Sequence, residues 1–138
     1  MKYLLDTNTV SEPKRKRPNA AAAAWLRRVD QSLLFISVLT LGEIENGVTR
    51  LASRDKIAAD ALRAWAEGIR ADFSSRIIAV DLAIAETWGR ISARRPLPVA
   101  DGLLAATALV HGMTLVTRNV RDVADTGVKL INPWDDDG

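Results

Sequence analysis

The sequence predicts an α/β protein in which a mostly parallel central sheet lies between two layers of helices, a three-layer α/β/α sandwich. Short apolar runs, typical of buried strands, stand at residues 3–5, 33–37, 77–80, 114–117 and 128–131. Stretches with apolar residues at helical spacing separate most of these runs, at residues 20–29, 40–51, 55–73, 82–92 and 101–112. Strands that alternate with helices favour parallel pairing, with helices on both faces of the sheet.

Local signals mark where these elements begin and end. Asn19 is a typical N-cap residue and predicts a helix start at residue 20. Thr40 and Asp101 are expected to open two further helices, and Gly112 to close the second of them. Two prolines bracket a basic run at residues 14–17, which we therefore expect to form a loop.

Composition limits the class of protein. The chain has 138 residues, 48% of them apolar, and we expect one domain over residues 1–138. The absence of cysteine excludes disulfides, thiolate zinc sites and a cysteine nucleophile. No apolar run is long enough to span a membrane and no signal peptide is evident, so we expect a cytoplasmic protein without a membrane partner.

Four acidic residues are distinguished by their positions relative to the predicted strands. Asp6 ends the first apolar run, and Glu43 lies in the first turn of the helix after the second run. Asp101 opens the helix before the run at 114–117, and Asp122 follows that run. Because strand ends and the following helix starts share one edge of a parallel sheet, we expect these four acids to converge.

Converging carboxylates indicate a cation site. They repel one another unless protons or a cation compensate their charge. Mg²⁺ prefers oxygen ligands, uses one or two carboxylates directly and keeps several waters. His111 is the single histidine, which excludes an imidazole-rich zinc site. The sequence therefore predicts a Mg²⁺ or Mn²⁺ site, a type of site that suits phosphodiester hydrolysis.

Each acid also has a purely structural interpretation. Asp6 and Asp122 would suit turns after strands, and Asp101 would suit a helix N-terminus, where it complements the helix dipole. Thr40 and Glu43 match a capping box, in which the glutamate satisfies a free amide at the helix start. Taken singly these signals do not separate the two interpretations, and the ordered set of four favours a site.

Four motifs together resemble the PIN-domain family: YLLDTNTVSEP at 3–13, TLGEIENGV at 40–48, VADGLLAATALVHG at 99–112 and LVTRNVRDV at 115–123. The similarity is greatest to the VapC-type and FitB-type toxins of bacterial toxin–antitoxin pairs. It covers essentially the whole chain, with the motifs in the family's order and at its spacing. The resemblance implies a compact α/β/α sandwich and a Mg²⁺- or Mn²⁺-dependent endoribonuclease.

The resemblance also assigns site residues by position. The family's acidic quartet corresponds to Asp6, Glu43, Asp101 and Asp122, with Asp6 and Asp101 as the expected direct metal ligands. Its supporting polar positions correspond to Thr7, Asn8, Thr117 and Asn119. The family often has phenylalanine after the fourth acid, whereas this chain has Val123. Asp125 therefore remains an alternative fourth acid.

An RNA substrate and a protein partner are implied as well. Family members usually form homodimers and are silenced by a cognate antitoxin, whose carboxy-terminal segment places a basic residue on the acidic site. The expected substrate is a structured RNA, either transfer or ribosomal RNA, cut in an exposed loop. The candidate contacts to the RNA backbone are Arg15, Arg17, Arg94, Arg95, Arg118 and Arg121.

Two other classes remain open. A catalytically silent PIN-like module that binds RNA or protein would not need all four acids intact. A different α/β magnesium protein fits less well. A haloacid-dehalogenase-type phosphatase would need aspartate at position 8, where Asn8 stands, and a receiver domain would place a lysine where Arg118 follows the run at 114–117.

Overall fold

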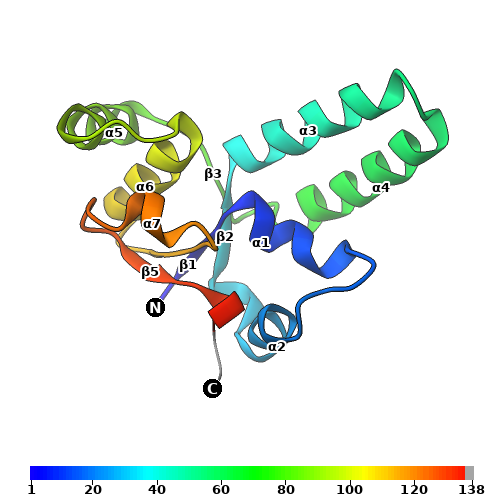
Figure 1. Ribbon diagram of the computed structural model, residues 1–138, viewed down its shortest axis with the longest axis horizontal. Helices are drawn as coiled ribbons and strands as arrows, with labels where there is room; N and C mark the ends of the chain where they lie inside the picture. The colour runs from blue at the N-terminus through cyan, green and yellow to red at the C-terminus, as the bar shows by residue number, and fades with distance from the viewer. Residues whose placement is uncertain (136–138) are drawn as a thin grey trace.

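A five-stranded, entirely parallel sheet forms the centre of the computed structural model, which describes residues 1–135 (Figure 1). The strands are β1 (Tyr3–Leu5), β2 (Leu34–Ser37), β3 (Ile77–Ile78), β4 (Thr114–Val116) and β5 (Lys129–Ile131). Their order across the sheet is β3-β2-β1-β4-β5, and each neighbouring pair is parallel. The predicted fold class is confirmed, although β3 is shorter than the apolar run at 77–80 suggested.

Helices cover both faces of this sheet. The longer ones are α2 (Ala20–Arg28), α3 (Val38–Ala52), α4 (Lys56–Asp72), α5 (Leu82–Arg94) and α6 (Val99–His111). Two short helices, α1 (Thr7–Ser11) and α7 (Val120–Val123), follow β1 and β4 directly. Short 3₁₀ turns complete the described elements: η1 (Glu12–Lys14), η2 (Gln31–Leu33) and η3 (Pro133–Asp135).

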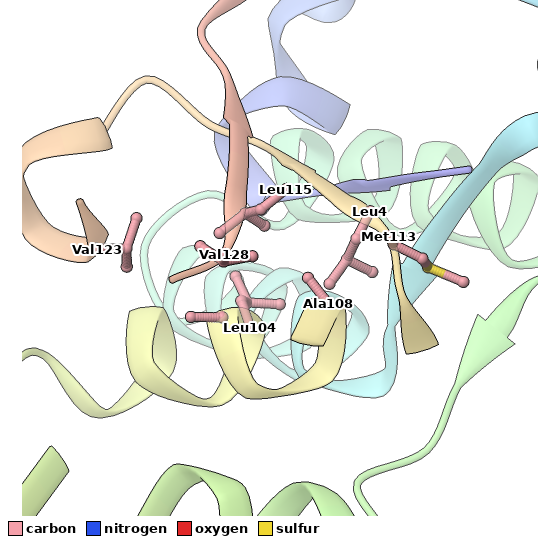
Figure 2. Close-up of a cluster of buried hydrophobic side chains, with 8 residues drawn as sticks. Leu4, Leu104, Ala108, Met113, Leu115, Val123 and Val128 are labelled. Atoms are coloured by element: carbon pink, nitrogen blue, oxygen red, sulfur yellow. The ribbon is translucent and has the colours of Figure 1, made fainter. Parts of the chain in front are cut away.

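The alternation of side chains along the strands explains the two helical layers. Leu4 and Leu115 point to one face, where they join a buried cluster with Leu104 and Ala108 of α6 (Figure 2). Leu5 and Val116, the next residues, point to the other face and pack with Trp25, Phe73 and Val10. Both faces of β1 and β4 are therefore apolar, as expected for central strands of a parallel sheet buried on both sides. Figure 1 shows α5–α7 on one side and α1–α4 on the other.

Helix starts confirm some of the local predictions and correct others. The Asn19 side chain caps α2 by accepting a hydrogen bond from the Ala22 N–H at 2.9 Å. Thr40, however, does not open α3. That helix begins two residues earlier, capped by Ser37, whose Oγ accepts from the Leu39 N–H at 3.0 Å. The predicted capping box of Thr40 and Glu43 is wrong because a serine at the strand end already supplies the cap.

The first turn of α6 also differs from the prediction. α6 begins at Val99, with Pro98 in the N-cap position, so Asp101 lies within the first turn instead of capping it. Beside it, Gly102 allows α5 to approach closely, since a Cβ there would lie only 2.9 Å from Cδ1 of Trp88. At the other end, Gly112 has φ of 64°, the left-handed conformation expected of a helix-ending glycine.

The predicted loop around the basic run is partly ordered as helix. Ser11 ends α1, and Glu12 begins the 3₁₀ turn η1. The Glu12 side chain is buried and accepts a hydrogen bond from the Asn19 N–H at 2.8 Å, which closes the loop against the start of α2. Within residues 1–135, no helix has the length and apolar character needed to cross a membrane. The expectation of one domain over residues 1–138 extends beyond the described range and stays a prediction.

Candidate functional site

The candidate site lies at the carboxyl edge of the sheet, between β1 and β4. The chain order reverses between these two strands. From β1 the chain first builds β2 and β3 on one side, and β4 and β5 are then added on the opposite side of β1. Such switch points are where open α/β sheets leave a crevice for ligands. Asp6 follows β1 and Thr117 follows β4, and the Thr117 Oγ1 donates a hydrogen bond to Asp6 Oδ2 at 2.6 Å. The two strand ends are thus joined through the Asp6 carboxylate.

Asp6 is buried, with 5% of its surface exposed, and it also caps α1. Its Oδ1 accepts hydrogen bonds from the Thr9 N–H at 2.8 Å and the Thr9 hydroxyl at 2.7 Å. These donors engage the acceptor capacity of Oδ1, whereas Oδ2 accepts only from Thr117 and retains a lone pair. In place of the turn that the sequence suggested, Asp6 caps a helix, and this role leaves one oxygen able to hold a cation.

Glu43 reaches this edge from α3 through a side-chain contact with α1. The Thr7 hydroxyl donates to Glu43 Oε1 at 2.7 Å, and Thr7 Oγ1 lies 3.2 Å from the Thr40 hydroxyl oxygen. Thr40 is fully buried, which fixes this end of the contact. Thr7 follows Asp6 in the sequence, so its hydrogen bond holds the Glu43 side chain close to Asp6. Glu43 does not cap α3, because Ser37 does so.

Three of the four predicted acids, Asp6, Glu43 and Asp101, line one cavity, and the charge of the fourth, Asp122, acts on Asp101. The pKa of Asp101 is raised, first by its partial burial and then by the negative charges of Asp122, Asp6 and Glu43. Those three carboxylates come from different elements, and each lies close enough to disfavour the ionised form of Asp101. A small cavity of about 130 Å³ opens at this point. Its lining residues are Asp6, Thr7, Asn8, Glu43, Ala100, Asp101, Leu104 and Asn119.

The structure separates the two candidates for the fourth acid. Asp125 is bound by Arg95, whose Nε and Nη2 lie 2.8 and 2.6 Å from the two carboxylate oxygens. This bidentate pairing lowers the pKa of Asp125. Asp122, in α7, has its carbonyl bound by the same Arg95 at 2.8 Å, while its carboxylate acts on Asp101. Of the two, Asp122 is the one whose charge acts on Asp101, whereas Asp125 belongs to a surface ion pair with Arg95.

The predicted supporting residues take different parts in the site. Thr7 and Thr117 orient the carboxylates of Glu43 and Asp6, and Asn8 and Asn119 line the cavity. Thr117 Oγ1 in turn accepts the Asn119 N–H at 3.0 Å.

Sequence reasoning missed Thr9 and Thr40, which are both fully buried and hydrogen-bonded to site residues. For Thr9 a signal was present, because the spacing of Asp6 and Thr9 is that of an N-cap and the third helical residue.

The donor set fits a hard divalent cation. Among residues 1–135, no three histidine, cysteine, aspartate or glutamate side chains form a group that could hold a metal ion. One or two carboxylates with water in the remaining positions is, however, the usual arrangement for Mg²⁺. Asp6 Oδ2 and the Asp101 carboxylate could bind such an ion directly. Its positive charge would offset the repulsion that raises the pKa of Asp101.

Residues 3–128 match the PIN domain family. The chain is 32% identical to Toxin FitB of Neisseria gonorrhoeae, covering 96% of this chain and 99% of that protein. The crystal structure of FitAcB from the same organism has a TM-score of 0.88 at 32% identity, covering 96% and 99% of the two chains.

Two further similarities extend over nearly the full length. VapC ribonuclease Y4jK of Sinorhizobium fredii is 28% identical and covers 96% of this chain and 97% of that protein. The structure of a toxin-antitoxin complex from Klebsiella pneumoniae has a TM-score of 0.66 at 25% identity, covering 96% and 98%. With its motifs, its fold and a family match over residues 3–128, this chain belongs to the PIN domain family.

Proposed function

We propose that this protein is a Mg²⁺- or Mn²⁺-dependent endoribonuclease and the toxin of a toxin–antitoxin pair. The observation that carries the proposal is the cavity at the sheet edge that Asp6, Glu43 and Asp101 line together, with the charge of Asp122 acting on Asp101. The names of its relatives, a FitB toxin and a VapC ribonuclease, support the same activity. Structured RNA, either transfer or ribosomal RNA, is the proposed substrate.

The positions of the site residues suggest which of them bind the metal ion and which orient those ligands. Asp6 and Asp101 would hold the ion. One oxygen of Asp6 retains a lone pair, and a cation would offset the burial and negative charges that raise the pKa of Asp101. When bound, Mg²⁺ or Mn²⁺ would polarise the phosphoryl oxygen and stabilise the departing 3′ oxygen. Thr9 and Thr117 fix the orientation of the Asp6 carboxylate.

Glu43 is the proposed proton acceptor. Thr7 engages only Oε1 of Glu43, so Oε2 is available to accept a proton from the attacking water. Asp122 adds negative charge that favours cation binding beside Asp101. Attack on the phosphorus with loss of the 3′ oxygen would leave one fragment with a 5′-phosphate and the other with a 3′-hydroxyl.

We also propose that a cognate antitoxin covers this site. A lysine or arginine placed on the four carboxylates would neutralise them and compete with the cation. A similar chain occurs in a solved toxin-antitoxin complex, which supports the toxin–antitoxin hetero-oligomer; a homodimer is the alternative assembly.

Cleavage of total bacterial RNA by the purified, antitoxin-free protein tests the activity. We expect discrete fragments with Mg²⁺ or Mn²⁺, none with a chelator, and 5′-phosphate ends on sequencing. Asp6→Asn should cut at least about a hundredfold more slowly, since it removes a proposed metal ligand. Asp60→Asn, an exposed acid on α4, is the matched control and should cut normally.

Two results would overturn the proposal. Cleavage that persists in chelator, or in folded Asp6→Asn, would place the chemistry elsewhere. An antitoxin-free protein that cuts no RNA with either metal would instead identify a silent binding module.

A further inference from the structure

Arg118 is the sequence neighbour of two residues of the acidic site, and its side chain contacts an aromatic ring. It lies between Thr117, which binds Asp6, and Asn119, which lines the cavity. Its guanidinium carbon is 5.5 Å from the ring centroid of Trp134, within the range of a cation–π contact. The Trp134 backbone is held in η3, where its backbone N–H donates a hydrogen bond to Asn132 Oδ1 at 3.0 Å. The ring therefore limits the positions that the Arg118 head can take.

Two other candidate RNA contacts, Arg95 and Arg15, already bind protein groups. Arg95 forms the bidentate pair with Asp125 and also binds the Asp122 carbonyl. Arg15 pairs with the buried Glu12 at 3.5 Å. Arg118, by contrast, is exposed and makes no hydrogen bond or ion pair with any residue in the described range 1–135. Its N–H donors remain available although its orientation is restricted.

We propose that Arg118, oriented by Trp134, binds a phosphate of the RNA backbone close to the bond that is cut. This inference rests on the proposed nuclease function and names a substrate contact of the same site. A guanidinium stacked on an aromatic face keeps its N–H edges free, and these match two phosphate oxygens at once. Restricting the side chain in advance reduces the conformational entropy lost on binding. Trp134 is a positioning residue in this arrangement.

The contact is tested by RNA binding in an Asp101→Asn background, which prevents cleavage. The probe is a fluorescein-labelled, single-stranded RNA of mixed sequence, about twelve nucleotides long, titrated at several salt concentrations. We expect Arg118→Ala to weaken binding about tenfold and to reduce the salt slope by about one phosphate contact. Arg118→Lys should recover only part of this loss, because lysine lacks the planar fork.

Two further variants separate orientation from charge. Trp134→Leu should weaken binding several-fold at unchanged net charge, whereas Trp134→Phe, which keeps an aromatic face, should retain most of it. Arg54→Ala is the matched control. Arg54 lies in the turn that joins α3 to α4, and Figure 1 shows this turn far from α7. It should bind RNA like the parent.

The outcomes distinguish this inference from the function on which it rests. If the wild type cuts RNA and the Asp101→Asn protein binds it, but Arg118→Ala in that background behaves like Arg54→Ala, the phosphate contact is wrong and the nuclease proposal stands. If the wild type cuts no RNA and the Asp101→Asn protein binds none, both fail. A DNA probe of the same sequence should show an equal loss in Arg118→Ala. A loss confined to RNA would assign the contact to the ribose hydroxyl and overturn the phosphate assignment.

Discussion

Replacing Asp101 with asparagine is expected to abolish RNA cleavage and, at the same time, to raise the Tm of the metal-free protein. The cleavage rate should fall by about a thousandfold or more, because a metal's contribution of several kcal/mol depends on this carboxylate. The Tm should rise because the substitution removes a partly buried charge that three other carboxylates repel. Sites built for binding commonly carry such a stability cost.

The pH dependence of this stabilisation follows from the raised pKa of Asp101. Above that pKa the native state carries an unfavourable charge that the unfolded chain tolerates, so Asp101 destabilises the wild type. As the pH falls through the raised pKa, Asp101 takes up a proton in the native state first, and the penalty disappears. The Tm advantage of Asp101→Asn should therefore be largest near neutral pH and vanish in acid.

Thermal unfolding in chelator, at low ionic strength and across this pH range, measures the effect. Asp60→Asn is again the control, because Asp60 is exposed and pairs with Lys56 at 3.2 Å. That variant should not be stabilised. An Asp101→Asn protein that is less stable than the wild type at neutral pH would show that repulsion does not govern this site.

Asp6 is expected to respond in the opposite way. Asp6→Ala should lower the free energy of unfolding by about 3 kcal/mol, because it removes a helix cap and leaves buried donors of Thr9 and Thr117 without their acceptor. For a protein of this size the Tm should fall by roughly 10 °C. The Thr9 hydroxyl can still turn to the Val116 carbonyl, 3.1 Å away, which limits the loss.

Urea and thermal denaturation of Asp6→Ala and Asp6→Asn provide the comparison. Asparagine retains one side-chain oxygen, so Asp6→Asn should lose clearly less stability while still failing to cut RNA. If Asp6→Ala unfolded at the wild-type temperature, the hydrogen bonds that join β1, α1 and β4 would not contribute as the structure implies.

The fold and the acidic set were predictable because they rest on strong, local signals. Apolar runs and helical spacing define a parallel sheet, and the geometry of such a sheet brings strand ends together. Asp6 and Asp122 could therefore be placed from their positions after 3–5 and 114–117. The short helices α1 and α7 escaped prediction, since four or five residues are too few to show helical spacing.

The finer structure of the site depends on contacts between residues far apart in the sequence. Glu43 fits a capping box by its spacing from Thr40, and only the hydrogen bond from Thr7 shows that its side chain contacts α1 instead. Likewise, the sequence favours Asp122 by motif but leaves Asp125 as an alternative, and Arg95, 30 residues earlier, is seen to bind Asp125 only in the structure. Tertiary partners, and not local patterns, decided both assignments.

Calorimetric titration of Mn²⁺ into the wild type and its variants tests most directly whether the four acids form one cation site. The wild type is predicted to bind Mn²⁺, Asp101→Asn to lose this binding, and Asp122→Asn to bind more weakly. Asp125→Asn, which alters an acid paired with Arg95, should bind like the wild type. Unchanged binding in Asp101→Asn, or its loss in Asp125→Asn alone, would contradict the site described here.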